Sequence, residues 1–279
     1  MKTQRKYPVV LTIAGFDASG GAGIQADIKT ISALGCYATS VLTALPLQNT
    51  KTVKSIFEIP AHIVTEQLHL LLEDIEPDAI KIGMLNSAEN ILGIAKILKL
   101  YPNIPVILDP IMISSSGTIL IHNDAKDTLQ KELFPLISLL TPNLDESAYL
   151  VGFPVISADD MLLAAQKISD MGAKAVLVKG GHLRSNIIPS LYLDANNNSH
   201  LIDQKRVDSP NTRGTGCTLS SAIASFLAQG LPLFEAIAAA HKYVFKAINS
   251  AKAISIGKGN GPMNHFFDPQ EMTASTFNN

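Results

Sequence analysis

The stretch NTRGTGCT at residues 211–218 places two glycines and a cysteine where a polar loop turns into the apolar run LSSAIASFLAQG. A helix that begins here leaves its first backbone N–H groups unpaired. Glycines let an anion approach that backbone closely, and the helix dipole favours negative charge there. Gly214, Thr215, Gly216 and Cys217 are therefore predicted to form a phosphate site with a reactive side chain at its edge. From this octet alone, a plain glycine-containing loop before a helix is an equal alternative.

The two cysteines are expected to differ because of their positions in the chain. Cys217 lies at a helix N-terminus, where a thiol pKa near 7 is attainable. Cys36 lies in LGCYA at a helix–strand junction, so it is expected to pack as a small apolar residue. Two cysteines so far apart indicate no disulfide framework and fit a reducing compartment, so a cytoplasmic location is expected.

Additional candidate site residues, most of them polar, follow the predicted strands, where a parallel α/β sheet places its ligands. They stand at or just after the carboxyl ends of the apolar segments: Asp17, Gln48, Asn49, Met84, Asp109, Asn143, Glu146 and Lys179. Several loops that converge on one edge are stronger evidence of a site than any single motif.

Lys179, Asp109, Asn143 and Glu146 have the chemistry of a phosphate and metal site. A lysine at the end of a buried strand is costly unless its ammonium reaches water or an anion, and phosphate is the natural partner of Lys179. A lysine that snorkels to the rim is the alternative. Asp109 and Glu146, with Asn143, could hold Mg²⁺ beside a phosphate. Asp109 also fits a strand-end turn, and Asn143 with Glu146 fits a helix cap, which does not exclude the metal role.

Two other segments suit a small organic substrate. The loop AGFDASGGAGIQAD at 14–27 lacks both the Lys-Ser/Thr of a P-loop and the spacing of a dinucleotide fingerprint. Its glycines, Gly15 first, could bring backbone amides close to a substrate, with Asp27 turned toward it. The alternative is a tight turn with a solvated Asp27. Gln48 can donate and accept together, which suits an aminopyrimidine edge, although a surface amide is the alternative there.

The scaffold for these residues is predicted from alternating apolar runs and segments of helical period. Strands are predicted at 9–14, 37–45, 79–83, 105–109, 136–141 and 175–180, and helices from 22 to a stop at Gly35 and at 61–73, 87–99, 157–171, 215–229 and 232–250. This alternation predicts an α/β fold with a mostly parallel sheet. The segment 187–207, with its Asn-rich turn at 196–198, predicts an antiparallel hairpin near the sheet edge. One domain is expected over 1–279, with its core at roughly 7–267.

The composition argues against several classes of protein. Lys plus Arg number 22 and Asp plus Glu 24, for a net charge of −2, whereas a nucleic-acid binder shows a clustered basic excess. No apolar run approaches the roughly 18 residues of a membrane span, and VVLTIA is expected to be a strand rather than part of a signal peptide. The histidines, His182 among them, show no metal-ligand spacing, which argues against a zinc enzyme. No nucleic-acid or membrane partner is expected.

Seven segments carry a family likeness over nearly the whole chain: TIAGFDASGGAGIQADIKT, QNT, KIGML, LDPIM, LTPNLDE, VLVKGGH and GTGCTLSSAI. In this order they closely resemble the hydroxymethylpyrimidine/phosphomethylpyrimidine kinases of thiamine biosynthesis, within the ribokinase-like superfamily. Cys217 is the most discriminating position, because sugar kinases of the superfamily carry an Asp there. Arg213 replaces a usual His, and Phe16, Pro46 and Leu47 also depart from the family's usual residues.

The resemblance implies a three-layer α/β/α fold and ATP-dependent phosphorylation of 4-amino-5-hydroxymethyl-2-methylpyrimidine, then of its monophosphate. It implies ATP and Mg²⁺ as cofactors, with a monovalent cation left open, and a homodimer. A pyridoxal or pyridoxine kinase is the nearest alternative, and a catalytically silent binding protein on the same fold is another. Carried over by motif, the resemblance implies that the pyrimidine is bound by Gln48, Asp27, Met84 and Gly15. It implies phosphate binding by Lys179, Asn143 and Arg213, and Mg²⁺ binding by Asp109 and Glu146. It also implies an anion hole at Gly214, Thr215 and Gly216, and base catalysis by Cys217.

Overall fold

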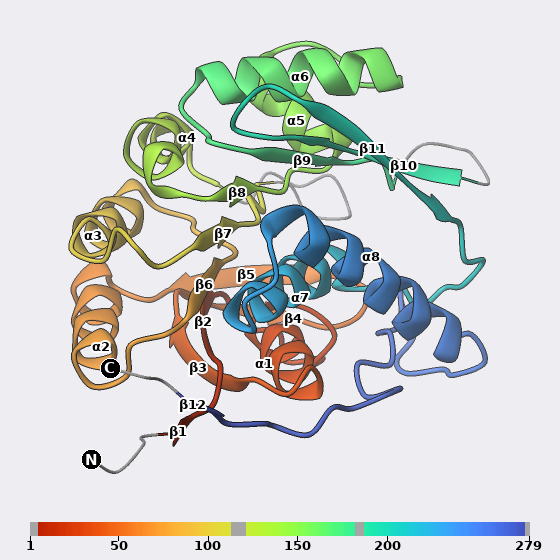
Figure 1. Ribbon diagram of the computed structural model, residues 1–279, viewed down its shortest axis with the longest axis horizontal. Helices are drawn as coiled ribbons and strands as arrows, with labels where there is room; N and C mark the ends of the chain where they lie inside the picture. The colour runs from red at the N-terminus through yellow and green to blue at the C-terminus, as the bar shows by residue number, and fades with distance from the viewer. Residues whose placement is uncertain (1–4, 113–120, 182–186, 277–279) are drawn as a thin grey trace.

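The computed structural model describes residues 5–112, 121–181 and 187–276 and centres on an eight-stranded sheet in the order β11-β10-β9-β8-β7-β6-β2-β3 (Figure 1). The neighbours from β3 to β9 run parallel: β3 (Tyr37–Leu42), β2 (Val9–Ala14), β6 (Ala79–Ile82), β7 (Val106–Leu108), β8 (Leu139–Leu140) and β9 (Val176–Lys179). The predicted hairpin forms as β10 (Ile187–Leu193) and β11 (Ser199–Lys205), which extend the sheet antiparallel at its edge. The parallel strands therefore bring their carboxyl ends to one edge.

Successive strand residues pack into two hydrophobic clusters, one on each face of the sheet, as the two-fold period of a strand requires. In β9, Val176 and Val178 lie in one cluster and Leu177 in the other. In β2, Leu11 and Val10 divide in the same way. Burial on both faces explains why these strands read as continuous apolar runs.

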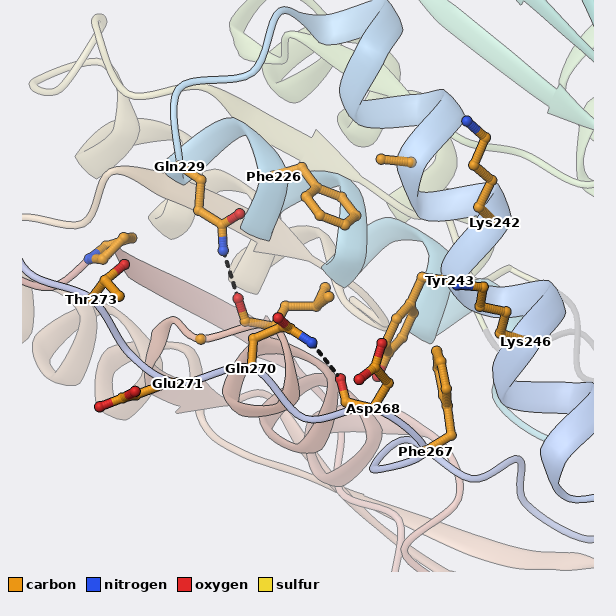
Figure 2. Close-up of a pocket in the computed structure, with 14 residues that line it drawn as sticks. Phe226, Gln229, Lys242, Tyr243, Lys246, Phe267, Asp268, Gln270, Glu271 and Thr273 are labelled. Carbon is orange, nitrogen blue, oxygen red and sulfur yellow. Dashed lines mark hydrogen bonds between the residues drawn. The ribbon is translucent and has the colours of Figure 1, made fainter.

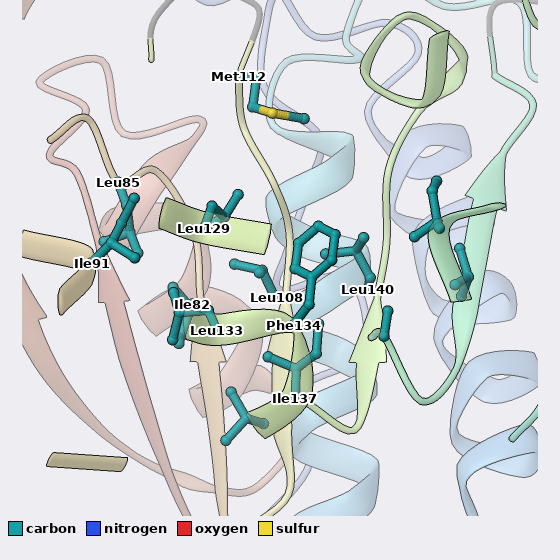
Figure 3. Close-up of a cluster of buried hydrophobic side chains, with 14 of the residues drawn as sticks. Ile82, Leu85, Ile91, Leu108, Met112, Leu129, Leu133, Phe134, Ile137 and Leu140 are labelled. Carbon is teal, nitrogen blue, oxygen red and sulfur yellow. The ribbon is translucent and has the colours of Figure 1, made fainter. Parts of the chain in front are cut away.

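Helices cover both faces and complete three layers (Figure 1). The first cluster includes residues of five helices: α2 (Ala61–Asp74), α3 (Ala88–Leu98), α4 (Asn123–Thr128), α5 (Leu144–Val151) and α6 (Ala158–Asp170). Figure 3 shows part of this cluster around Phe134, which is fully buried. The second cluster includes residues of α1 (Gly23–Ala33), α7 (Thr215–Ala228) and α8 (Leu233–Ser250). The predicted fold class is confirmed.

The structure departs from the predicted elements at several places, and α4 is a helix that the pattern did not predict. The strand expected over 37–45 is broken, because β4 (Ala44–Gln48) pairs antiparallel with β5 (Val53–Glu58) instead of continuing in the large sheet. Sequence patterning missed β5 because this strand is largely exposed and its apolar residues neither alternate nor form a continuous run. The strand expected over 136–141 shortens to β8, since the chain before it forms a π-helical turn (Leu129–Leu133) and a 3₁₀ turn (Phe134–Leu136). The pair of β1 (Arg5–Lys6) with β12 (Ser275–Thr276) was also not predicted.

Local signals at the helix ends agree with the structure. Gly35, the predicted stop of α1, has a φ of +77°, a conformation that glycine adopts without the strain of a side chain. Asn143 and Glu146 form a reciprocal capping box at the start of α5, as their spacing predicted.

Within the described ranges, no helix is long and apolar enough to cross a membrane.

Candidate active site

The glycine-containing segment before α7 forms the start of a helix without a side-chain cap. Gly214 is the N-cap in a left-handed conformation, with a φ of +76°, and a Cβ there would collide with the carbonyl oxygen of Gly21. This contact joins the segment to the first glycine-rich loop. Among the described residues, no acceptor is recorded for the N–H groups of Gly216 and Cys217. These two donors are therefore available to an anion at the helix N-terminus.

Gly216 lies over an ion pair formed at the ends of two strands. Lys179 Nζ lies 2.6 Å from Asp109 Oδ1, which also accepts a hydrogen bond from Thr141 Oγ1 at 3.0 Å. A side-chain carbon on Gly216 would stand 3.2 Å from both Lys179 Nζ and Asp109 Oδ2. Burial lowers the pKa of Lys179, but the carboxylates of Asp109 and Glu146 outweigh this effect and leave the pKa raised. The ammonium therefore stays charged beside the helix N-terminus.

Glu146 joins this cluster from the first turn of α5. Its Oε2 accepts a hydrogen bond from the Asn143 N–H at 2.8 Å, and Asn143 Oδ1 accepts from the Glu146 N–H at 2.9 Å. Asn143 also forms a parallel bridge with Lys179. Burial raises the pKa of Glu146 to about 7, the Lys179 ammonium opposes this shift, and Asp109 adds to it. The cap is thus confirmed, and it holds a second carboxyl group close to Asp109.

The thiol of Cys217 is buried but lies near charged groups. Burial raises its pKa to about 11, the Lys81 ammonium opposes this, and the carboxylates of Asp27 and Asp109 add to it. The expectation of a pKa near 7 is therefore wrong, because desolvation of the thiolate outweighs the helix N-terminus. Cys36 has a pKa raised to about the same value, and it belongs to the second hydrophobic cluster, whereas Cys217 belongs to neither cluster. The two cysteines therefore differ in their neighbours and not in their pKa values.

Asp27 takes part in a fully buried ion pair that sequence reasoning missed. Its Oδ2 accepts from Lys81 Nζ and from Thr12 Oγ1, both at 2.7 Å, and its Oδ1 accepts from Ser221 Oγ at 2.8 Å. The side chains of Lys81 and Asp27 are 0% exposed. The available signal was a lysine inside the otherwise apolar strand AIKI. Ser221 lies one turn after Cys217, so this network ties the cysteine-bearing face of α7 to β2, β6 and α1.

Gly15, Met84 and Gln48 come together at the first glycine-rich loop. A Cβ on Gly15 would stand 2.5 Å from Met84 Cε, so the absence of a side chain lets the methionine approach. Gln48 Nε2 donates to the carbonyl oxygen of Phe16 at 3.2 Å. Arg213 contacts the same loop, with its guanidinium against Asp17. The structure thus groups Gly15, Met84, Gln48 and Arg213 around the first glycine-rich loop, and groups Lys179, Asp109, Asn143 and Glu146 at the ends of the strands, where Gly216 approaches Lys179 and Asp109.

A separate cavity of about 590 Å³ lies away from these residues (Figure 2). Its lining includes Pro8 and Leu34 near the amino ends of the strands, and Tyr243 and Lys246 of α8. No residue of the predicted site lines it. The predicted site residues lie at the carboxyl ends of the strands and not in this cavity. His182, at the end of the VLVKGGH segment, lies outside the described residues.

A family profile and a relative that matches most of this chain agree on one family. The profile of the phosphomethylpyrimidine kinase family matches residues 17–264. A hydroxymethylpyrimidine/phosphomethylpyrimidine kinase of Rhizobium meliloti is 44% identical over 92% of this chain and 97% of its own length. A thiamine biosynthesis bifunctional protein of Geobacter sulfurreducens is also 44% identical over 94% of this chain, which spans only 53% of that protein.

Solved structures of two kinds of kinase share the fold. A phosphomethylpyrimidine kinase from Clostridium difficile is 42% identical with a TM-score of 0.76, over 86% of this chain and 99% of that one. A pyridoxal kinase from Staphylococcus aureus, solved with ADP, is 30% identical with a TM-score of 0.86, over 98% of this chain and 100% of that one. The sequence is thus more similar to the first, while the second matches a larger share of this chain.

Proposed function

Because this chain belongs to the phosphomethylpyrimidine kinase family, we propose that it transfers a phosphoryl group from ATP to 4-amino-5-hydroxymethyl-2-methylpyrimidine and then to the resulting monophosphate, in thiamine biosynthesis. The observation that carries this proposal is the Lys179–Asp109 ion pair next to Gly216, in a chain whose Gly15, Met84 and Gln48 gather at the first glycine-rich loop. Phosphate groups and a flat acceptor ring can therefore meet at the N-terminus of α7.

Phosphoryl transfer passes through a loose transition state, so catalysis depends on positioning and on stabilisation of charge. The N–H groups of Gly216 and Cys217 would donate to the oxygens of the transferred group, in the manner of an anion hole. Gly214 and Thr215 set the geometry of that turn, with Gly214 held against Gly21. The Lys179 ammonium, kept charged by its carboxylate neighbours, would neutralise the nucleotide phosphates.

The same cluster fits Mg²⁺. Hydrogen bonds among the described residues occupy Asp109 Oδ1 and Glu146 Oε2 and leave the second oxygen of each carboxylate without a recorded donor. Mg²⁺ prefers such oxygens and is commonly bound by one or two carboxylates together with substrate phosphates. Over the described ranges no three His, Cys, Asp or Glu side chains form a metal site on their own, so the phosphates would complete it. Bound there, Mg²⁺ would offset negative charge on the phosphates.

Cys217 is proposed to face the acceptor hydroxyl and to assist loss of its proton. With a pKa near 11 the thiol is protonated at neutral pH, so it can act as a base only to the extent that bound groups stabilise the thiolate. Lys81 is the cation that opposes the raised pKa. We expect general-base assistance to add to the charge stabilisation at residues 214–217.

Gly216→Ala is expected to lower kcat by about 10²-fold, comparable with the loss of one oxyanion-hole donor. The added methyl group would stand 3.2 Å from Lys179 Nζ, in space that phosphoryl oxygens must use. Alanine favours a helix over glycine by up to about 1 kcal/mol, which opposes the crowding of the ion pair, so the melting temperature should change by no more than a few degrees. Steady-state kinetics and thermal unfolding measure both effects. Unchanged turnover would place the phosphoryl group elsewhere.

The acceptor is tested with purified protein, ATP and Mg²⁺, and each candidate alcohol. We expect turnover of the aminopyrimidine alcohol and of its monophosphate to exceed that of pyridoxal. The high backbone similarity to a pyridoxal kinase makes pyridoxal the relevant competitor. Higher kcat/KM for pyridoxal would establish the alternative, and no turnover with any alcohol would favour a binding protein.

Two further properties belong to this proposal. A homodimer is proposed from the family resemblance, and sedimentation equilibrium would measure its mass. A cytoplasmic location is proposed because both cysteines are free. Fractionation of cells that express the chain would check it.

A further inference from the structure

The guanidinium of Arg213 is bound by the first glycine-rich loop. Its Nε donates to Asp17 Oδ2 at 3.1 Å and to Ser19 Oγ at 3.0 Å, while its Nη2 donates to Asp17 Oδ1 at 3.0 Å. The Asp17 side chain is 1% exposed and that of Arg213 is 15% exposed. A two-point contact of this kind fixes the plane of the guanidinium as well as its place.

The carboxylate of Asp17 is itself held rigidly. It also accepts hydrogen bonds from the N–H groups of Ser19, Gly21 and Ala22. Burial raises the pKa of Asp17, but the hydrogen bonds from Arg213 and Ser19 outweigh this effect and lower it, so the pair stays ionised. The positive charge of Arg213 is thus balanced by the carboxylate of Asp17 in the first glycine-rich loop.

A second contact of Arg213 determines how the Gln48 amide is oriented. Arg213 Nη2 donates to Gln48 Oε1 at 3.3 Å, and Gln48 Nε2 donates to Phe16 O at 3.2 Å. A guanidinium can only donate and a carbonyl can only accept, so the oxygen and nitrogen of this amide cannot exchange places without losing both bonds. One N–H and one lone pair of the amide are left for a ligand.

We propose that Arg213 is a positioning residue that fixes the Gln48 amide so that it can bind a ring edge offering one acceptor and one donor. An aminopyrimidine, with a ring nitrogen next to an exocyclic amine, has that edge. This inference rests on the proposed function. It assigns Arg213 to acceptor selection, and it competes with the expectation that Arg213 binds the phosphates.

The test is a double-mutant cycle between Arg213→Met and Gln48→Ala, with ligand affinities measured by calorimetry. Arg213→Met should weaken binding of the pyrimidine alcohol about tenfold, within the range of coupling for groups in contact. It should leave the dissociation constant of a non-hydrolysable ATP analogue within about twofold. In the Gln48→Ala background the same substitution should have little further effect on the alcohol, because the amide that it positions is gone.

Two variants sharpen the cycle. Arg213→Lys should behave like Arg213→Met toward the alcohol, since one ammonium cannot reproduce the planar two-point contact while it reaches Gln48. Lys29→Met is the matched control, because Lys29 Nζ donates to Gly20 O in the same loop at 2.7 Å and no bond from it to Gln48 is recorded. This control should bind the alcohol as the parent does.

Additive losses in the cycle would overturn the inference, because a purely structural arginine weakens binding whether or not Gln48 is present. A loss confined to the ATP analogue or to the phosphorylated acceptor would also overturn it, in favour of phosphate binding. If the parent itself binds no pyrimidine alcohol, the proposed function fails first and this inference fails with it. The parent measurement therefore distinguishes the two failures.

Discussion

Cys217→Ala is expected to lower kcat by 10²–10⁴-fold, the usual contribution of general acid–base catalysis, and to leave nucleotide affinity unchanged. The thiol lies on the N-terminal turn of α7 beside the proposed anion site, and alanine keeps the helix and the backbone donors. Because the raised pKa of about 11 suppresses the thiolate, the lower end of that range is the better estimate. Single-turnover kinetics with the pyrimidine alcohol measure the loss.

The dependence of turnover on pH tests whether the Cys217 thiolate acts as the base. Below the thiol pKa, the thiolate fraction rises about tenfold for each pH unit. Turnover of the parent should therefore increase with pH between about 8 and 9, above the range in which Glu146 ionises, whereas Cys217→Ala should lose that increase. Cys36→Ala is the matched control: its thiol has a similarly raised pKa but packs in an apolar cluster, so turnover should not change. Turnover of Cys217→Ala within about twofold of the parent would remove the thiol from the mechanism.

Lys81→Met is expected to lower the free energy of unfolding by about 3–5 kcal/mol, because it leaves the Asp27 carboxylate buried without its counter-charge. Thr12 and Ser221 would still donate to Asp27, but neither carries a charge. Both members of the pair are 0% exposed, so no water can replace the lost ammonium without a rearrangement of the core. Equilibrium denaturation with urea, followed by circular dichroism, measures the change.

A second variant shows whether the loss comes from unbalanced charge. Lys81→Met with Asp27→Asn removes both charges and keeps a polar group for Thr12 and Ser221, so most of the lost stability should return. Lys6→Met is the control, because the Lys6–Asp78 pair is partly exposed, at 37% and 25%, and should contribute no more than about 1 kcal/mol. Equal losses in Lys81→Met and Lys6→Met would show that burial does not make this pair special.

The sequence by itself determined most of the scaffold and the sheet edge at which the candidate site residues lie. Two-sided burial produces continuous apolar runs, so β2, β6, β7 and β9 could be located from hydrophobicity alone. Parallel strands must end on one edge, so Lys179 and Asp109, 70 positions apart, could be predicted to meet. The Asn143–Glu146 cap was predictable because capping involves neighbours three residues apart.

Only the tertiary structure decided the electrostatics and the pairing of those residues. Asp27 and Lys81 lie 54 positions apart, and Arg213 and Asp17 lie 196 apart, so no local pattern specifies either contact. The pKa of Cys217 was misjudged because a helix N-terminus is visible in the sequence while the extent of desolvation is not. The separate pairing of β4 with β5 was also not predictable, because strand pairing depends on which strand edges are free in space. Periodicity reports burial along one element, whereas charge balance depends on every element packed around a group.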